Sequence, residues 1–318
     1  MDYWSNCSNS TPVKYQLRVT NCGVATTYTG ILNPGDADFG GAGAGRTIAN
    51  IDYSACAGLS VKGKATFDDI AVMTGGIATT PNPLPIRNAV VEVRAVSGDT
   101  LLGSGATDET GNYSINFAMA TPAPYYVKVL AQDKNATPIQ KVSNYTGTTI
   151  YSAKSAEQNA STTPHAINVL VQAKQADGSA KAFNIYDVGV RNFKNVARWY
   201  PLATLQPLIW MWESGLPACG GTGGSASCYA GNGVIKVNSP ASDPDENDDS
   251  VISHEFGHFV IRSLSVDQSP GGEHTLNPLL AWSEGAATFW GQGALDSQYY
   301  LDYFRDDRAG GSGAFSVG

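Results

Sequence analysis

The chain has 318 residues, of which 42% are apolar, enough for two ordinary hydrophobic cores or one large one. Its formal net charge is −8, and its 20 lysine and arginine residues form no cluster, which argues against nucleic acid or an anionic membrane as a partner. The sequence lacks the run of roughly eighteen apolar residues that a membrane-spanning helix requires, so no membrane span is expected.

Residues 1–58 form a cysteine-bearing, β-rich N-terminal segment, to which no function is assigned. Its glycine-rich stretch NPGDADFGGAGAG cannot form a helix, whereas pieces such as YQLRVT favour strands. The first residues, MDYWSNCSNS, lack the basic and apolar regions of an export signal. Only 15% of the residues are charged, and Gly, Ser, Thr, Asn and Tyr are plentiful, as is typical of secreted β-rich proteins. We expect a secreted or cell-surface protein whose export signal was removed ahead of Met1.

The five cysteines do not form a zinc site of their own, because none lies in a C-x-x-C pair. Cys219 and Cys228 flank the short flexible loop CGGTGGSASC, and an extracellular setting favours a disulfide between them. Two of the cysteines Cys7, Cys22 and Cys56 can also pair, and the sequence does not indicate which.

Residues 59–165 are predicted to form a small antiparallel β-sandwich. The pieces NAVVEVRAV, GNYSINFA and YYVKVLAQ place apolar residues at every second position, and SGDT and TDETG separate them as turns. Their order, and ATDETGNYSI above all, resembles the carboxypeptidase regulatory-like and Cna-type B families. The resemblance implies a transthyretin-like fold that acts as a spacer or support. Some relatives carry a Lys–Asn isopeptide bond, for which Lys62 or Lys64 would be the lysine.

Residues 166–318 are predicted to form an α+β domain. The segment AFNIYDVGVRNFKNVARWY spaces its apolar residues as an amphipathic helix that ends before Pro201. PLIWMWES is expected to be a buried strand, and GVIKVNS an edge strand. Val234, Ile235 and Val237 of this edge strand are candidate substrate-binding residues, because an extended peptide can pair with a free strand edge.

The segment DDSVISHEFGHFVIRSL contains two candidate metal ligands and a candidate general base. His254 and His258 lie four apart, so on a helix both project from one face and can bind one metal ion. Glu255 follows the first histidine, where its carboxylate can act as a general base. This H-E-x-x-H arrangement is typical of zinc peptidases. Ile252, Phe256 and Phe259 point the opposite way, into a core, and Asp248, Asp249 or Ser250 can cap the helix.

A catalytic zinc needs a third protein ligand. The extended pattern with a third histidine is excluded, because Ile261 and Leu264 occupy the positions where glycine and histidine would stand. The remaining candidates are Asp267, Glu273, His274 and Glu284. We favour Glu284, which lies in the apolar segment NPLLAWSEGAATFWGQG, where an unpaired carboxylate would be costly.

The segment WSEG resembles the third-ligand motif of the gluzincin peptidases, the thermolysin-like and fungalysin-like group. The resemblance implies a zincin-like fold, Zn²⁺ bound by His254, His258 and Glu284, and a protein or peptide substrate. Ser283 stands where asparagine is common, and the loop between the two helices is longer than usual. In such enzymes a helical lobe follows the third ligand, and we expect this chain to be part of a longer protein.

These motifs predict a secreted zinc metalloendopeptidase with Glu255 as general base. Two alternatives stay open: a binding or adhesive protein with an inert zinc domain, and a zinc hydrolase of a non-protein amide or glycopeptide. His274 and the tyrosines near 299–303 are candidate oxyanion donors, although helical packing would equally explain the tyrosines. The acidic run DPDEND is a candidate Ca²⁺ site that lacks the pattern of an EF-hand. The sequence does not indicate the oligomeric state.

Overall fold

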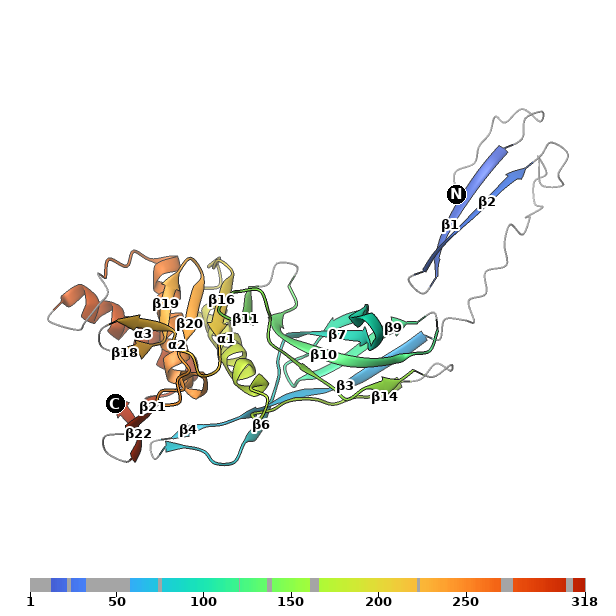
Figure 1. The fold of residues 1–318 in the computed structure, drawn as a ribbon. Helices are drawn as coiled ribbons and strands as arrows, with labels where there is room; N and C mark the ends of the chain where they lie inside the picture. Colours follow the sequence, from blue (N-terminus) through green and yellow to red (C-terminus); the bar gives the residue numbers. More distant parts are fainter. Residues whose placement is uncertain are drawn as a thin grey trace.

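The computed structural model describes residues 13–21, 24–32, 58–73, 76–119, 121–135, 139–160, 166–221, 224–269, 277–306 and 311–317. The protein is β-rich, with three α-helices in the described ranges: α1 (Ser179–Trp199), α2 (Asp249–Leu264) and α3 (Pro278–Leu295). Figure 1 shows the helices gathered at one end of the two main sheets. None of these helices combines the length and the apolar character that crossing a membrane would require.

The first sheet centres on one long strand, β3 (Gly58–Asp69). It pairs with the antiparallel strands β6 (Asn82–Pro85) and β9 (Asn112–Ala118) and with the parallel strands β14 (Ala166–Asn168) and β15 (Val171–Ala173). Alternate residues of β3 and β9 are buried, which is the pattern of a sheet with one face on a core.

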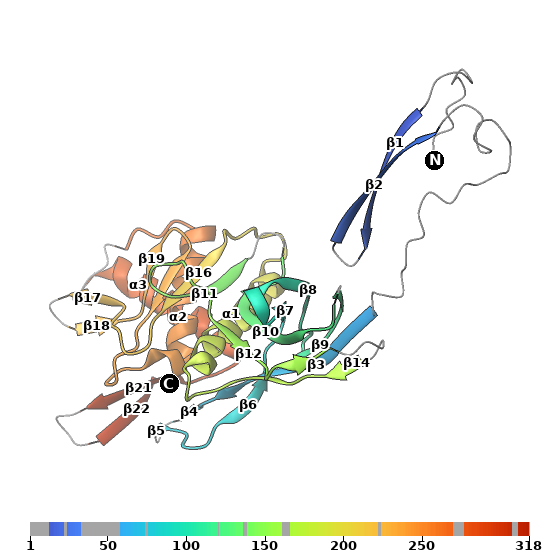
Figure 2. The same ribbon diagram turned by 45° about the vertical axis from the view of Figure 1, so that its right-hand side comes forward.

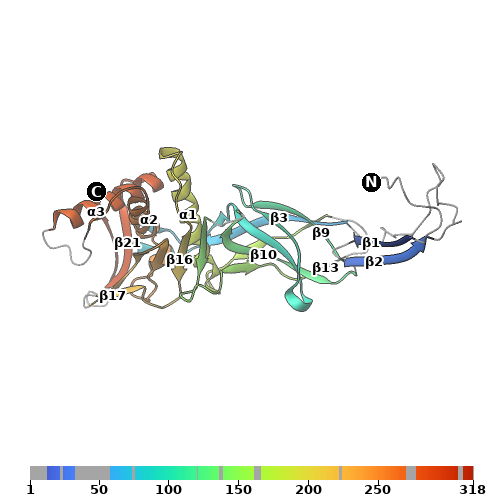
Figure 3. The same cartoon turned by 90° about the horizontal axis from the view of Figure 1, so that it is seen from above.

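The second sheet has the strand order β19-β20-β16-β11-β10-β7-β8 in the described residues, with β12 and β13 also paired to β10. Its strands are β7 (Ala89–Ala95), β8 (Leu101–Ala106), β10 (Pro124–Asp133), β11 (Gln140–Ser143), β12 (Ser152–Lys154), β13 (Gln158–Asn159), β16 (Leu208–Trp212), β19 (Cys228–Gly231) and β20 (Val234–Val237). This sheet runs from the β-rich half into the helical half, as Figure 3 shows from above.

The two expected halves exchange strands. β14 and β15 follow residue 165 in the chain yet pair with β3, and β11 precedes it yet pairs in parallel with β16. The described hydrophobic core is correspondingly one cluster that extends from Val61 through Val91 to Trp210 and Phe256. The predicted boundary at 165/166 therefore does not coincide with a break in either sheet.

Short elements complete the fold. They are the hairpins β1 (Val13–Asn21) with β2 (Val24–Leu32), β4 (Val72–Met73) with β5 (Gly76–Ile77), β17 (Cys219–Gly221) with β18 (Gly224–Ala226) and β21 (Tyr300–Asp306) with β22 (Gly311–Val317), and the 3₁₀ turns η1 (Ser97–Asp99) and η2 (Asp245–Asn247). Figure 2 shows the β17–β18 and β21–β22 hairpins at the helical end of the molecule.

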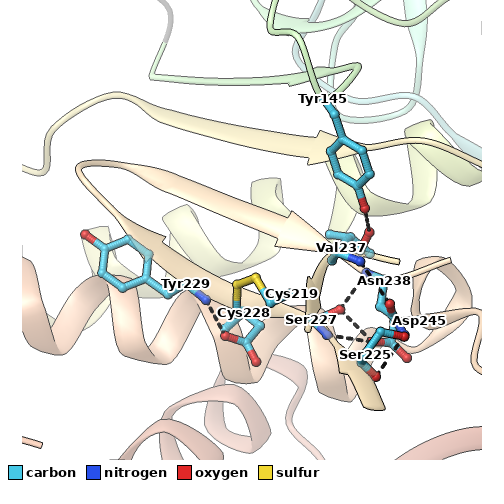
Figure 4. Close-up of a disulfide and its surroundings, with 11 residues drawn as sticks. Tyr145, Cys219, Ser225, Ser227, Cys228, Tyr229, Val237, Asn238 and Asp245 are labelled. Carbon is cyan, nitrogen blue, oxygen red and sulfur yellow. Dashed lines mark hydrogen bonds between the residues drawn. A yellow bond between two sulfur atoms is a disulfide. The ribbon is translucent and has the colours of Figure 1, made fainter. Parts of the chain in front are cut away.

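Several local expectations are confirmed. The amphipathic segment that ends before Pro201 is α1, and PLIWMWES contains β16, whose Leu208, Trp210 and Trp212 are buried. The Cys219–Cys228 disulfide is present (Figure 4). The possible pairing among Cys7, Cys22 and Cys56 lies outside the described residues.

The edge-strand expectation for GVIKVNS is wrong. β20 lies between β19 and β16, so both of its edges are hydrogen-bonded, and Ile235 and Val237 are fully buried. The free edge belongs to β19, which precedes β20 in the chain. Because strand order depends on contacts between distant segments, the period-2 pattern alone does not distinguish an interior strand from an edge strand.

Candidate functional site

Helix α2 carries His254, Glu255 and His258, and α3 crosses it closely enough to bring Glu284 alongside. The crossing depends on Gly257, where an added Cβ would lie 2.6 Å from the carbonyl oxygen and 2.8 Å from the Cα of Ala287. The two helix backbones therefore meet at a position that accepts only glycine without displacement. The glycine of HEFGH is thus part of the reason that Glu284 reaches the two histidines.

His254, His258 and Glu284, which we call the histidine–glutamate triad, bring three ligand atoms together. The Nε2 atoms of the two histidines are 3.1 Å apart, and Oε2 of Glu284 lies 3.1 Å from Nε2 of His254 and 3.3 Å from Nε2 of His258. Tetrahedral zinc with ligands at about 2.0–2.1 Å separates its ligand atoms by about 3.3 Å. The spacing in the triad fits three corners of such a tetrahedron.

The outer nitrogens of the histidines are held by hydroxyl groups of α3. Nδ1 of His254 lies 3.0 Å from Oγ1 of Thr288, and Nδ1 of His258 lies 3.5 Å from Oγ of Ser283. When Nδ1 carries the proton and donates to the hydroxyl, Nε2 presents its lone pair to the triad. The sequence analysis missed Thr288, although its position four residues after Glu284 places it on the same helix face.

Charge within the triad shifts two pKa values. The hydrogen bonds from His254 and His258 hold the pKa of Glu284 well below its usual range. Burial acts to lower the pKa of His258, but the Glu284 hydrogen bond and the charge of Glu255 outweigh it, so the net shift is upward. Both shifts arise because the carboxylate of Glu284 lies close enough to the imidazoles for each to stabilise the charged form of the other.

Glu255 is 8% exposed, and its carboxylate faces the same cleft as the triad. Its Oε2 atom accepts a hydrogen bond of 2.7 Å from the backbone N–H of Tyr229 on the edge strand β19. Burial raises the pKa of Glu255. A backbone donor leaves no trace in the sequence, so this contact could not have been predicted from the residue types.

The cleft has a volume of about 540 Å³ and lies between α2 and the segment Ala226–Gly231. Glu255, His258 and Glu284 line one side of it, and β19 lines the other. The strand edge beside the cleft is therefore β19 rather than the segment containing Val234, Ile235 and Val237.

The other candidate ligands and donors fall in different places. Asp267 lines the cleft, but its Oδ2 atom accepts a hydrogen bond from Ser283 rather than joining the triad. His274 and Glu273 lie outside the described residues. Tyr300 and Tyr303 belong to the strand β21 and not to a helix, and the Tyr300 ring contacts that of His254 edge-on, with centroids 6.0 Å apart.

Two further details of the helices differ from the expectations. Asp248 occupies the N-cap position of α2 without capping it, because its Oδ2 atom accepts from the backbone N–H of Tyr303 instead. The apolar segment around Glu284 suggested buried surroundings, yet its Trp282 and Phe289 are 55% and 74% exposed. The apolar residues of α3 thus extend around the helix to its outer face.

A second group of potential metal ligands lies at the N-terminal end of α2. Carboxylate oxygens of Asp243, Asp245 and Asp302 lie within 4.8 Å of one another. The described residues therefore contain two groups that could hold a metal ion, one mixing nitrogen and oxygen ligands and one consisting of oxygen ligands alone.

Comparisons with known proteins assign no family. No known protein family matches the sequence, and no curated protein resembles it. Solved structures with weak similarity include a 9R-lipoxygenase from Cyanothece PCC8801, 12% identical, with a TM-score of 0.22, covering 47% of this chain and 25% of the lipoxygenase. Another is the major plantain pollen allergen Pla l 1, 13% identical, with a TM-score of 0.21, covering 36% of this chain and 92% of the allergen. Similarities this low carry no functional argument, so the function must be argued from the site.

Proposed function

We propose that this chain is a secreted zinc metalloendopeptidase of the gluzincin type. The observation that carries the proposal is the mutual distance of 3.1–3.3 Å between three ligand atoms that come from two different helices. Three atoms with lone pairs repel one another at this distance unless protons or a cation lie between them. Two imidazoles and one carboxylate are a donor set typical of catalytic zinc.

Zinc held by His254, His258 and Glu284 would supply a Lewis acid that polarises the scissile carbonyl and acidifies a water molecule. Glu255 accepts the proton of the attacking water at Oε1, since Oε2 is held by the Tyr229 N–H. The same carboxyl group then donates this proton to the leaving amine. Burial raises its pKa, which makes the carboxylate a stronger base for the first of these steps.

The edge strand β19 would bind the substrate. It lines the cleft, so an extended peptide can lie alongside it, with the Tyr229 N–H kept for Glu255 rather than for the peptide. In this proposal a peptide bound beside β19 passes the triad as a continuous chain, which suits internal cleavage. In this proposal the β-rich half, residues 59–165, is a carboxypeptidase regulatory-like sandwich that supports the catalytic half.

The test begins with metal analysis of the purified protein by mass spectrometry, which should find one zinc ion per chain. The Glu255→Gln variant should keep that zinc and lose about 10²–10⁴-fold in the hydrolysis rate of a peptide library, the usual contribution of a general base. Glu157→Gln, an exposed glutamate remote from the cleft, is the matched control and should leave the rate unchanged. Full activity in Glu255→Gln would refute the assignment.

A further inference from the structure

Arg262 places a permanent positive charge in the cleft. Helix α2 carries His254, His258 and Arg262 at intervals of four residues, so they project from the same side of the helix, and Arg262 lies one turn beyond His258. Arg262 lines the cleft together with His258. Apart from the histidine, the other ionisable side chains among the described lining residues are tyrosine or acidic. An anionic group that enters the cleft therefore meets one arginine.

The guanidinium of Arg262 is oriented by the loop that follows α2. Its Nη1 atom donates a hydrogen bond to the backbone carbonyl oxygen of Asp267. Within the described residues, Nε and Nη2 of Arg262 donate no hydrogen bond. These two nitrogens form one edge of the planar guanidinium and can bind both oxygens of a single carboxylate. Arg262 is thus held in place while one carboxylate-binding edge stays available.

Arg262 forms no ion pair with a carboxylate of the described residues. Three other arginines do form such pairs, namely Arg87, Arg94 and Arg191. Asp267 offers Arg262 only its backbone oxygen, because its carboxylate is used elsewhere. One carboxylate oxygen of Asp267 accepts from the Ser269 N–H at 2.9 Å and the other from the Ser283 hydroxyl at 3.1 Å. The charge of Arg262 is therefore not neutralised by its neighbour in the cleft.

The β19 side of the cleft carries no charged side chain that could select a substrate. It consists of residues 226–231, with the sequence ASCYAG, whose side chains are small or absent except that of Tyr229. On the α2 side, Glu284 belongs to the triad and Glu255 is the proposed general base. Arg262 is consequently the charged group that remains for contact with a substrate side chain.

Arg262 lies close enough to the triad to contact a residue beside the cleaved bond. From His258 to Arg262 the helix advances by about 6 Å, at about 1.5 Å per residue. An extended peptide in the cleft advances by about 3.3 Å per residue. The guanidinium therefore falls beside a substrate residue one or two positions from the bond that lies at the triad.

We propose that Arg262 makes the cleft selective for peptides with an aspartate or glutamate within two residues of the cleaved bond. The substrate carboxylate binds side-on to Nε and Nη2 of Arg262. Glutamine, which has nearly the same shape as glutamate, is disfavoured because its amide places a donor where the guanidinium requires an acceptor. The inference deepens the proposed function and rests on it in taking a peptide as the ligand.

The test compares two pools of random peptides, blocked at both ends, with a fixed glutamate or a fixed glutamine at the centre. The zinc-loaded parent protein should cleave the glutamate pool about tenfold faster, the lower end of what a hydrogen bond to a charged group contributes. The cleaved bonds should lie within two residues of the glutamate. Arg262→Gln should remove this preference, and Arg262→Glu should favour a third pool with a fixed lysine.

The matched control is Arg198→Gln, which removes an exposed arginine from the last turn of α1 and should keep the preference of the parent. Arg262 lies in the last turn of α2, where a positive charge also stabilises the helix. Arg262→Lys keeps this charge but loses the planar edge, so it should retain the melting temperature and only part of the preference. A purely structural role would change the melting temperature and leave the ratio of the two cleavage rates unaltered.

A binding measurement separates this inference from the proposed function. Retention of the pools on the immobilised, zinc-loaded Glu255→Gln variant requires no turnover. If the parent cleaves neither pool but the variant retains the glutamate pool about tenfold more strongly, the peptidase is refuted and the role of Arg262 stands. Equal cleavage of both pools would overturn the role of Arg262 alone, and equal retention, including none, would also count against it. A preference seen only for peptides with a free C-terminus would contradict the side-chain assignment.

Discussion

The two acidic groups at the N-terminal end of α2 differ in one respect. In the first, Arg191 lies among Asp69, Asp187 and Asp249, and its charge lowers the pKa that burial and the other carboxylates raise at Asp69. In the second, which consists of Asp243, Asp245, Asp248 and Asp302 and which we call the acidic cluster, no described side chain supplies a positive charge through an ion pair. In the first network Arg191 forms ion pairs with two carboxylates, whereas in the second Oδ1 of Asp248 is buried without a hydrogen-bond partner among the described residues.

In one respect the histidine–glutamate triad resembles the acidic cluster rather than the Arg191 network. Its three ligand atoms converge on one point, just as the carboxylates of the acidic cluster do. Crowding of like groups is not itself the sign of a ligand site, because the carboxylates of Asp187 and Asp249 are paired with Arg191. A clearer sign is the convergence of ligand atoms from separate elements on one point.

The largest expected effect comes from Glu284→Ala, which breaks the triad. Zinc should be lost from the purified protein, and peptide hydrolysis with it, because two histidines alone leave the metal with one protein ligand fewer than catalytic sites use. Metal content by mass spectrometry measures the change, and Glu157→Ala is the control. Retention of stoichiometric zinc would show that Glu284 is not a ligand.

Gly257→Ala tests whether the triad depends on the close approach of the two helices. The added methyl group would lie within 3.0 Å of backbone atoms at Ala287, so α3 must move and Glu284 with it. We expect a loss of about 1–3 kcal/mol in stability, as for other overpacked positions, together with weaker zinc binding. Thermal unfolding and zinc titration measure the two effects.

The control for that change is Gly285→Ala on the neighbouring helix. No atom lies within 4 Å of the added Cβ, and the position is inside α3. It should therefore stabilise the protein by about 0.5–1 kcal/mol through helix propensity alone. Equal behaviour of the two alanine variants would show that the helix crossing does not require glycine.

Arg191→Gln removes the cation that pairs with Asp187 and Asp249. The side chain of Arg191 is 29% exposed, so we expect a loss of about 2 kcal/mol, below the full cost of breaking a buried ion pair. Removal of the charge raises the pKa of Asp69 beyond its present value of about 6. A carboxylate with a raised pKa costs more stability as the pH rises, so the loss should be greater at high pH than at low pH. Urea unfolding at two pH values, one on each side of that pKa, measures this; a loss independent of pH would exclude the electrostatic explanation.

The sequence predicted what short-range periodicity and composition determine. The helix bearing His254 and His258 follows from spacing, and Glu284 was found because a carboxylate is conspicuous in an apolar segment. The meeting of these residues in space agrees with that expectation, while their binding of zinc stays a prediction. The acidic run was also visible, but only as consecutive residues.

The contributions missed by the sequence analysis come from distant segments or from the backbone. Asp302 joins the acidic cluster because β21 runs beside α2, which no local pattern indicates. The N–H of Tyr229 reaches Glu255 because β19, not β20, forms the sheet edge. Both depend on strand order, which is determined by the packing of the whole core rather than by any one segment.

The continuous sheet that passes through β10, β11 and β16 also determines how the protein can be dissected. A fragment beginning at residue 166 would lack β11, so the parallel edge of β16, with its buried tryptophans, would be uncovered, while β14 and β15 would have lost β3. Uncovered hydrophobic strand edges pair with other chains and promote aggregation. The helical half is therefore expected to remain soluble only when it is produced together with the β-rich half that precedes it.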